Sequence, residues 1–277
     1  MHGKALPRFE SPTLTQRMRS MLGVDFYRLF HTPMYYIFLA IAAIIPAMVV
    51  SMAGLGGPDG MAQAAPLYTN MWNIIAADTP LYVVRDIGDY ANMNMVFIFG
   101  GIMVSIFIGH DYRSGYVKQL FTTHAKKLDY MLSKSIVCAF AMACMCGTYL
   151  LGGMAGGILA GLDMDVNVGS LLIALLGKAV MSLGWASLYT FINVVLRRYF
   201  GVSITLSFIL GTGIPIIGAA AILGNTPALN VFLYGASVYA CLSSNILTLL
   251  VCIVISCLWT VACNALGTLV LSRSDVY

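Results

Sequence analysis

The sequence predicts an all-α integral membrane protein with six transmembrane helices in one domain at 34–277. Of the 277 residues, 60% are hydrophobic and only 9% are charged, whereas soluble domains carry about 25% charged residues. The apolar residues gather in long runs, and about 20 of them in a helix cross the hydrocarbon core. The net charge of +4 does not indicate a nucleic-acid partner, because the placement of the charges matters more than their sum. The lipid bilayer is the expected surrounding.

The N-terminal segment, residues 1–33, predicts an amphipathic helix in the cytoplasmic membrane interface. Ser11 is a suitable N-cap, and Pro12 suits the first helical position. Apolar residues then recur at helical spacing while arginines occupy the other face, as in helices that lie on a membrane. The apolar positions are Leu14, Met18, Met21, Leu22, Phe26 and Leu29, and the arginines are Arg17, Arg19 and Arg28. A disordered basic tail is the alternative.

Six apolar runs follow, and each predicts one span. They lie at about 34–53, 93–109, 131–155, 170–196, 200–223 and 247–271. Glycines in the third run predict close helix packing, because small residues let backbones approach in lipid; these are Gly152, Gly153, Gly156, Gly157 and Gly161. The fifth run should be weakened or kinked by Gly211, Gly213, Pro215 and Gly218.

Two connections are too apolar or too long to be simple loops. The first outer loop, 54–92, carries Tyr68, Trp72 and Tyr82 among apolar residues, which predicts short helices anchored at the outer interface. A ligand-binding role is the alternative. The stretch 225–246 predicts a re-entrant or interfacial element, with a loop or the start of the last span as alternatives.

Lysine and arginine predict the orientation, because they are enriched on the cytoplasmic side. In a six-span chain, most of the lysines and arginines fall on one side of the membrane: Lys4, Arg8, Arg17, Arg19, Arg28, Arg113, Lys118, Lys126, Lys127, Lys134, Arg197, Arg198 and Arg273. The opposite side has Arg85 alone, together with Asp59, Asp78, Asp86, Asp89, Asp163 and Asp165. Both termini are therefore expected in the cytoplasm.

The chain lacks the motifs of several enzyme classes. Its only glutamate is Glu10, which excludes a membrane metalloprotease built on HExxH or paired glutamates. No GxSxG elbow and no GxxxxGK[ST] phosphate loop occurs, so we expect no catalytic site and no ATPase of its own. The seven cysteines lie mostly in apolar runs and are expected to be structural, with no metal or cofactor site.

Two residues inside the spans are candidates for a transport pathway. Lys178 is an intramembrane cation. An unpaired charge in hydrocarbon costs free energy, so such a residue is a functional candidate by default. Its alternative is snorkelling to the outer interface. Pro215 would kink the fifth span, either to line a pathway or to adjust packing.

The basic segment 109–134 is longer than a connection between two spans requires. Its amphipathic middle, Tyr116 to Phe121, follows Gly115 and precedes the pair Lys126-Lys127. This composition indicates contact with something outside the membrane. The segment resembles the corresponding part of the membrane subunit (permease) of ABC-2 type transporters. The positions that carry the resemblance are Asp111, Gly115, Val117-Lys118-Gln119-Leu120, Thr123-His124, Lys126 and Ser133-Lys134. The chain departs from the family pattern at two of them, because proline is usual in place of His124 and glutamate is commoner than Asp111.

The resemblance implies six spans behind an N-terminal elbow helix, with a coupling helix between spans two and three. That helix would dock on a separate ATP-binding subunit, which would hold ATP and Mg. Its expected residues are Arg113, Ser114, Gly115, Tyr116, Val117, Lys118, Leu120 and Phe121, with Tyr116, Leu120 and Phe121 as apolar anchors and Arg113 and Lys118 as a charged rim.

A second membrane subunit, identical or a sister chain, is also implied, in a bacterial plasma membrane. Among ABC-2 exporters, the size and small outer loops are most similar to subunits that expel amphipathic or antimicrobial peptides, including lantibiotic-immunity exporters. Drug, lipid or polysaccharide export is the alternative, and an ATPase-independent secondary transporter or channel is the alternative from another class.

Overall fold

The computed structural model describes residues 13–55, 95–122, 126–161, 168–223, 231–242 and 246–273, and the elements among them are all helices. They are α1 (Leu14–Phe30), α2 (Pro33–Leu55), α4 (Met95–Arg113), α5 (Tyr116–Thr122), α6 (Lys127–Leu159), α7 (Val168–Val195), α8 (Phe200–Gly211), α9 (Ile214–Leu223), α10 (Leu233–Leu242) and α11 (Ile246–Arg273). The predictions for residues 1–12, for the outer loop beyond Leu55 and for Thr123-His124 lie outside the described residues.

Five of the described helices are long and apolar enough to cross a membrane. Their spanning parts are Pro33–Met52, Met95–Arg113, Lys127–Leu159, Leu171–Val195 and Leu249–Arg273. The predicted span at 200–223 is divided: α8 ends at Gly211 and α9 starts at Ile214. With 12 residues, α8 is about 18 Å long, which is shorter than a hydrocarbon core of about 30 Å. Six uninterrupted spans are therefore not confirmed, whereas the predicted interruption is.

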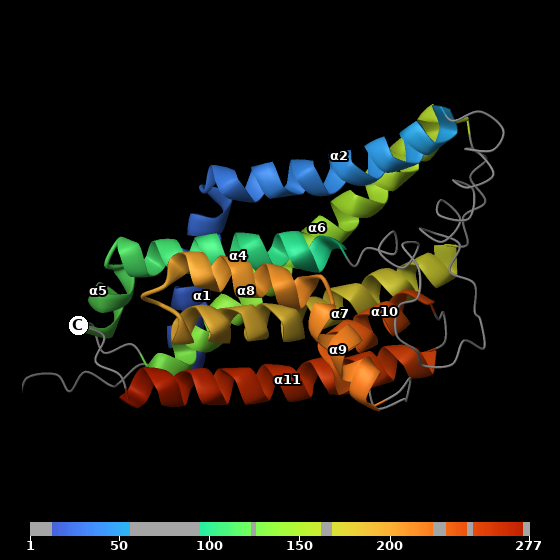
Figure 1. Ribbon diagram of the computed structural model, residues 1–277. Helices are drawn as coiled ribbons and strands as arrows, with labels where there is room; N and C mark the ends of the chain where they lie inside the picture. The colour runs from blue at the N-terminus through green and yellow to red at the C-terminus, as the bar shows by residue number, and fades with distance from the viewer. Residues whose placement is uncertain are drawn as a thin grey trace, which may run out of the picture.

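The long helices lie side by side along one axis of an elongated bundle (Figure 1). The central helix, α7, packs against α6, α11, α4 and α10. The spanning helices α2, α4, α6 and α7 alternate in direction, and α8 leads the chain away from the end where α4 and α7 finish (Figure 1). The start of α1 and the end of α11 lie at the same end of the bundle, because Arg17 pairs with Asp129 in the first turn of α6 and Lys127 donates to the Leu271 carbonyl.

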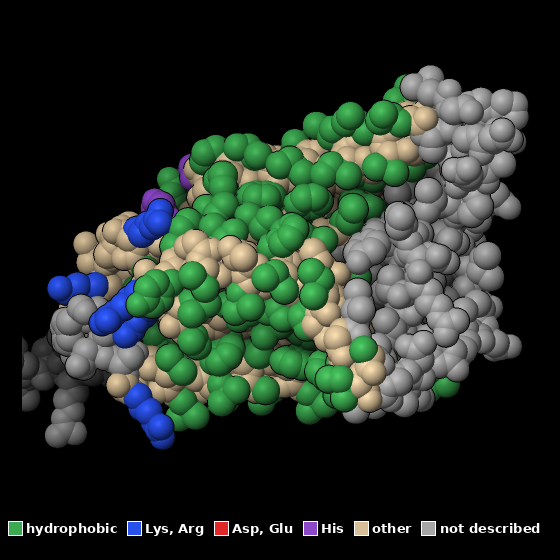
Figure 2. Space-filling view, viewed as in Figure 1, with side chains coloured by type: hydrophobic (Ala, Val, Ile, Leu, Met, Phe, Trp, Pro, Cys, Tyr) green, Lys and Arg blue, Asp and Glu red, His purple; other side chains and the backbone are tan. Residues whose placement is uncertain are grey.

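That end of the bundle carries the charged side chains of the described residues, apart from Lys178, and is called the basic end. Its described cations are Arg17, Arg19, Arg28, Arg113, Lys118, Lys126, Lys127, Lys134, Arg197, Arg198 and Arg273. Figure 2 shows lysine, arginine and histidine side chains gathered there, with hydrophobic side chains along the rest of the visible described surface. This separation is what a membrane and a positively charged cytoplasmic side require.

At the α2–α6 contact, two glycines of α6 lie directly against the backbone of α2. A side chain at Gly152 or Gly156 would collide with the backbone of Ala43 or Ala47 on α2. Only glycine therefore permits this crossing, which confirms the predicted small-residue packing at these two positions. Gly161 instead lies in the turn after α6, where an added side chain would meet nothing within 4 Å. The crossing also holds α2 at the edge of the bundle, where one face stays exposed.

Hydrogen bonds between buried polar side chains add to the packing of the spans. On α7, Asn193 donates to Ser105 Oγ of α4 at 3.0 Å and accepts from Ser203 of α8 at 2.6 Å. On α11, Asn264 accepts from Ser135 of α6 at 3.1 Å. Each such bond in bacteriorhodopsin contributes roughly 0.6 kcal/mol on average, so their main effect is to fix which helix faces meet.

The N-terminal helix begins two residues later than predicted. Thr13 is the N-cap of α1, and its side chain and that of Gln16 bond reciprocally to each other's backbone N–H groups in a capping box. Ser11 is therefore not the N-cap. The capping box satisfies two otherwise unpaired donors of the first turn, which explains why the helix starts here.

Candidate functional site

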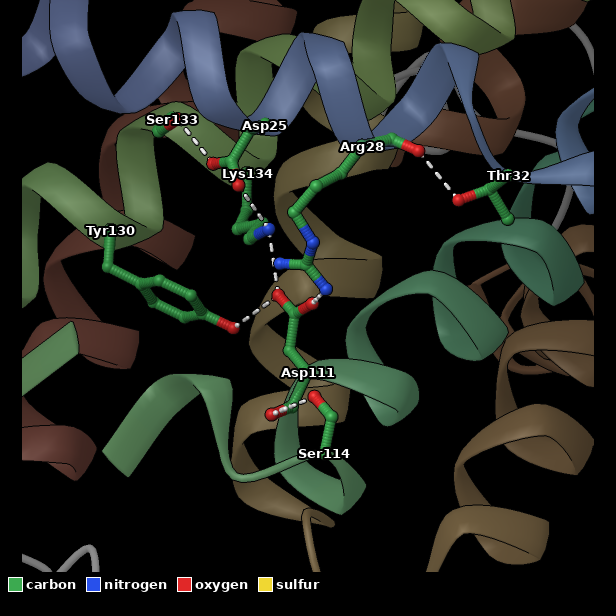
Figure 3. Close-up of polar contacts among 8 residues, drawn as sticks. All are labelled: Asp25, Arg28, Thr32, Asp111, Ser114, Tyr130, Ser133 and Lys134. Atoms are coloured by element: carbon green, nitrogen blue, oxygen red, sulfur yellow. Dashed lines mark hydrogen bonds and ion pairs between the residues drawn. The ribbon is translucent and has the colours of Figure 1, made fainter. Parts of the chain in front are cut away.

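A cluster of buried charges joins the N-terminal helix to the segment around α5. It consists of Asp25 and Arg28 from α1, Asp111 from α4 and Lys134 from α6, and is called the charge cluster. Lys134 Nζ lies 2.6 Å from Asp25 Oδ1 and 2.7 Å from Asp111 Oδ2. Arg28 Nη2 lies 2.5 Å from Asp111 Oδ1. Figure 3 shows Lys134 between the two carboxylates, with the Arg28 guanidinium next to it.

The cluster balances its charges, with two carboxylates and two cations in contact. Asp25, Asp111 and Lys134 are completely buried, so each would be very costly without its partners. Two hydroxyl groups complete the shell: Ser133 donates to Asp25 Oδ2 at 2.6 Å, and the Tyr130 hydroxyl lies 3.5 Å from Asp111 Oδ2. Because every member depends on the others, α1, α4 and α6 are held in one relative position.

Sequence reasoning missed the acidic partner on α1, because Asp25 lies on the face expected to be apolar. The buried positions of this helix are Met21, Asp25 and Leu29, which are spaced by four residues and share one face. Arg28, assigned to the polar face, instead pairs inward with Asp111. An acid within an apolar stripe was the available signal for a buried ion pair.

A second ion pair connects the start of α1 to α6. Arg17 Nε lies 2.8 Å from Asp129 Oδ2, in the first turn of α6. The arginine is partly exposed and the aspartate is buried. The amphipathic helix is thus packed on the bundle through both apolar and charged contacts.

A tight turn connects α4 to α5, and two of the predicted residues form it. Gly115 has a φ of +73°, a conformation that only glycine adopts readily. The Ser114 N–H donates to the His110 carbonyl at 2.9 Å, and the Gly115 N–H donates to the Tyr112 carbonyl at 3.3 Å. These bonds end α4 and direct α5 across the basic end.

The apolar face of α5 packs on the bundle itself. Val117 is buried beside Tyr130, and Phe121 meets the Tyr130 ring edge-on at 5.8 Å between centroids. The Tyr116 ring receives the Arg28 guanidinium at 4.1 Å from its centroid. Leu120 is also partly buried in this group. The residues expected to anchor a partner therefore make contacts within the chain first.

The outward face of α5 is polar. Its exposed residues are Lys118, Gln119 and Thr122, with Arg113 and Ser114 exposed just before the helix. Arg113 lies over the Phe200 ring at 4.0 Å, which ties the end of α4 to the start of α8. Of the predicted docking residues, Arg113, Ser114 and Lys118 are thus the most accessible.

Burial and charge act together on the groups where α1 meets α5. Burial lowers the pKa of Arg28, but the charge of Asp111 and its hydrogen bond outweigh this effect, so the pKa is raised. Burial raises the pKa of Tyr116, and the charge of Asp25 adds to the effect. The guanidinium therefore stays charged and the phenol stays neutral near pH 7, which preserves their cation–π contact.

The two candidate pathway residues lie in different surroundings. Lys178 is completely buried, its Nζ donates to the Ser237 carbonyl of α10 at 2.6 Å, and it lies 5.2 Å from the Phe97 ring centroid. This burial contradicts the snorkelling alternative. Pro215 is exposed and lines a small aromatic cavity of about 100 Å³ with Trp185 and others, but Lys178 is not part of that cavity.

The predicted re-entrant stretch contains a helix, α10, that packs on α7 and α11. Ser237 connects it to α7 twice, because it accepts from Lys178 at its carbonyl and from the Trp185 indole at its hydroxyl, at 2.8 Å. Whether the whole stretch re-enters the membrane stays a prediction. Within the described residues, no three His, Cys, Asp or Glu side chains are grouped to hold a metal ion.

Comparison with known proteins agrees with this architecture. The sequence pattern of the ABC-2 family transporter proteins matches residues 22–214 of the 277, more than half of the chain. The match extends from α1 to the start of α9 and includes the whole charge cluster. No curated protein and no solved structure shows a significant match. The chain therefore belongs to the ABC-2 family and is a membrane component of a transporter.

Proposed function

We propose that this chain is the permease subunit of an ABC-2 type exporter and that α5 is its coupling helix. The observation that carries the proposal is the charge cluster on α1, α4 and α6, which α5 contacts through the Tyr116 ring and Arg28. A push on α5 would reach α1 through the Tyr116–Arg28 contact. It would reach α6 through Asp111 and Lys134, so α1, α4 and α6 would move together with α5.

The family implies an ATP-binding partner, and the exposed face of α5 is the surface we assign to it. Lys118, Gln119 and Thr122 point outward from a helix fixed by Val117 and Tyr116. A rigidly held helix transmits displacement, whereas a mobile one would absorb it. We further propose that both termini face the cytoplasm of a bacterial cell and that a second membrane subunit completes the transporter.

The docking test changes only the exposed face of α5. We expect the double variant Lys118→Glu, Gln119→Trp to lower copurification of the ATP-binding subunit at least tenfold, because it reverses a charge and adds bulk at the interface. The matched control is Arg273→Glu, the same charge change on an exposed residue of α11. Equal association of the double variant and the wild type would refute the assignment.

This design separates docking from folding. Replacing Leu120 and Phe121 with Asp would also disrupt their packing near Tyr130, so a loss of binding would be ambiguous. The exposed pair avoids that ambiguity.

For the substrate, we propose an amphipathic or antimicrobial peptide, with drugs, lipids or polysaccharide as alternatives. The aromatic lining of the cavity beside Pro215, which includes Trp185 and Trp259, suits apolar side chains. Export assays in inverted vesicles with labelled peptide, with and without ATP, test the proposal. Export that ignores ATP would favour the secondary transporter or channel.

A further inference from the structure

We propose that the chain binds one anionic phospholipid in a cavity where α1, α2 and α4 meet at the basic end. The cavity has a volume of about 300 Å³, which is within the range of ligand pockets. It lies beside the turn between α1 and α2, where the chain enters its first span. The proposal does not depend on the ATP-binding partner or on the exported substrate.

The inner wall of this cavity is apolar. Met103, Ile106 and Phe107 of α4 face Met34 and Tyr35 of α2 across it. An apolar wall of this kind offers water no hydrogen-bond partner and accepts hydrocarbon. One of the acyl chains of a lipid supplies that hydrocarbon without needing any polar partner.

The rim of the cavity is polar and carries no lining carboxylate. Arg28, His31 and His110 lie there, and both histidines are exposed, so the cavity reaches the surface. The nearest acid of the charge cluster, Asp111, is completely buried and is engaged by Arg28 and Lys134. Arg28 pairs with Asp111 through Nη2, but its buried Nη1 has no hydrogen-bond partner among the described residues. This N–H group and two imidazoles beside an apolar cavity complement an anionic headgroup attached to an acyl chain.

The position also matches the depth of a lipid headgroup. Tyr27 and Tyr35 line the cavity, and Tyr36 is exposed beside it; tyrosines of this kind are enriched at the membrane–water interface. The α2 surface beyond the cavity is apolar and exposed, with Ile37, Ile44 and Met48 among its residues. A lipid seated here would therefore continue into the surrounding bilayer.

Native mass spectrometry of the delipidated full chain in detergent tests the proposal. We expect one tightly retained phosphatidylglycerol, bound at least tenfold better than phosphatidylcholine of the same chains. His110→Asp should remove this preference, because a carboxylate would oppose the phosphate. Ser272→Asp is the matched control, since it adds the same charge to an exposed residue of the basic end on α11, and it should bind as the wild type does.

A second variant tests the acyl-chain site. Ile106→Trp should fill the cavity and reduce retention of phosphatidylglycerol about tenfold, whereas Leu172→Trp, at an exposed apolar position on α7, should not. Size-exclusion profiles confirm that each variant is folded. Equal binding of the two lipids, unchanged retention by Ile106→Trp, or equally tight binding of glycerol phosphate without acyl chains would each overturn the proposal.

Discussion

The charge cluster predicts a large loss of stability when its central cation is removed. Lys134→Met keeps the length of the side chain. Among the described residues it leaves Asp25 with only the Ser133 hydroxyl, while Asp111 retains Arg28. Breaking a buried pair by removing one partner costs about 3–5 kcal/mol. At roughly 2–4 °C per kcal/mol for a chain above 150 residues, the Tm in detergent should fall by about 6–20 °C.

A double variant separates the ion pair from general packing. In Asp25→Asn combined with Lys134→Met, neither the unpaired carboxylate nor the cation remains, and the new amide oxygen would still accept from Ser133. We expect the destabilisation of the double variant to be about 1–3 kcal/mol smaller than the sum of the two single effects, as for residues in contact. Lys126→Met is the control, because this exposed lysine should cost no more than about 0.5 kcal/mol.

Thermal unfolding in detergent, followed by intrinsic fluorescence and checked by size exclusion, gives both quantities. If Lys134→Met unfolds within about 2 °C of the wild type, which corresponds to under 1 kcal/mol, the buried pairs do not hold the helices together. Strict additivity of the two substitutions would equally refute coupling between Asp25 and Lys134.

Three further predictions concern packing, transport and orientation. Gly156→Ala should lower the Tm because the added methyl group meets the backbone of α2, whereas Gly147→Ala, where that group meets nothing within 4 Å, should leave it equal or raise stability by up to about 1 kcal/mol. Lys178→Ala should reduce ATP-driven export, because it removes the buried cation bonded to Ser237; wild-type export rates would favour a purely structural lysine. A reporter fused after Tyr277 should be active in the cytoplasm, and an external signal would overturn the proposed orientation.

The hydropathy pattern of the sequence predicted the long helices well but not the start of every helix. The apolar runs identified the five long helices, and the glycines and proline near 211–218 indicated the interruption between α8 and α9. The start of α1 was misplaced because Ser11 and Thr13 are both good caps. The capping box formed by Thr13 and Gln16 decides between them, through two reciprocal hydrogen bonds rather than one.

The predicted docking segment shows where side-chain type was insufficient. Tyr116, Leu120 and Phe121 were expected to face a partner because they are large and apolar at helical spacing. In the structure they contact Arg28 and the group around Tyr130. Spacing identifies one face of a helix, but it does not say whether that face meets the same chain or another.

The sequence by itself determined the class of protein, the helices and the end of the bundle at which cations gather, because hydropathy and charge act over short stretches. Only the tertiary structure decided that Lys134 meets Asp25, which is 109 residues away, and that both share a buried site with Asp111 and Arg28. The physical reason is that a buried charge is stable only beside its partner. Which partner that is depends on how α1, α4 and α6 pack, not on the residues adjacent in the chain.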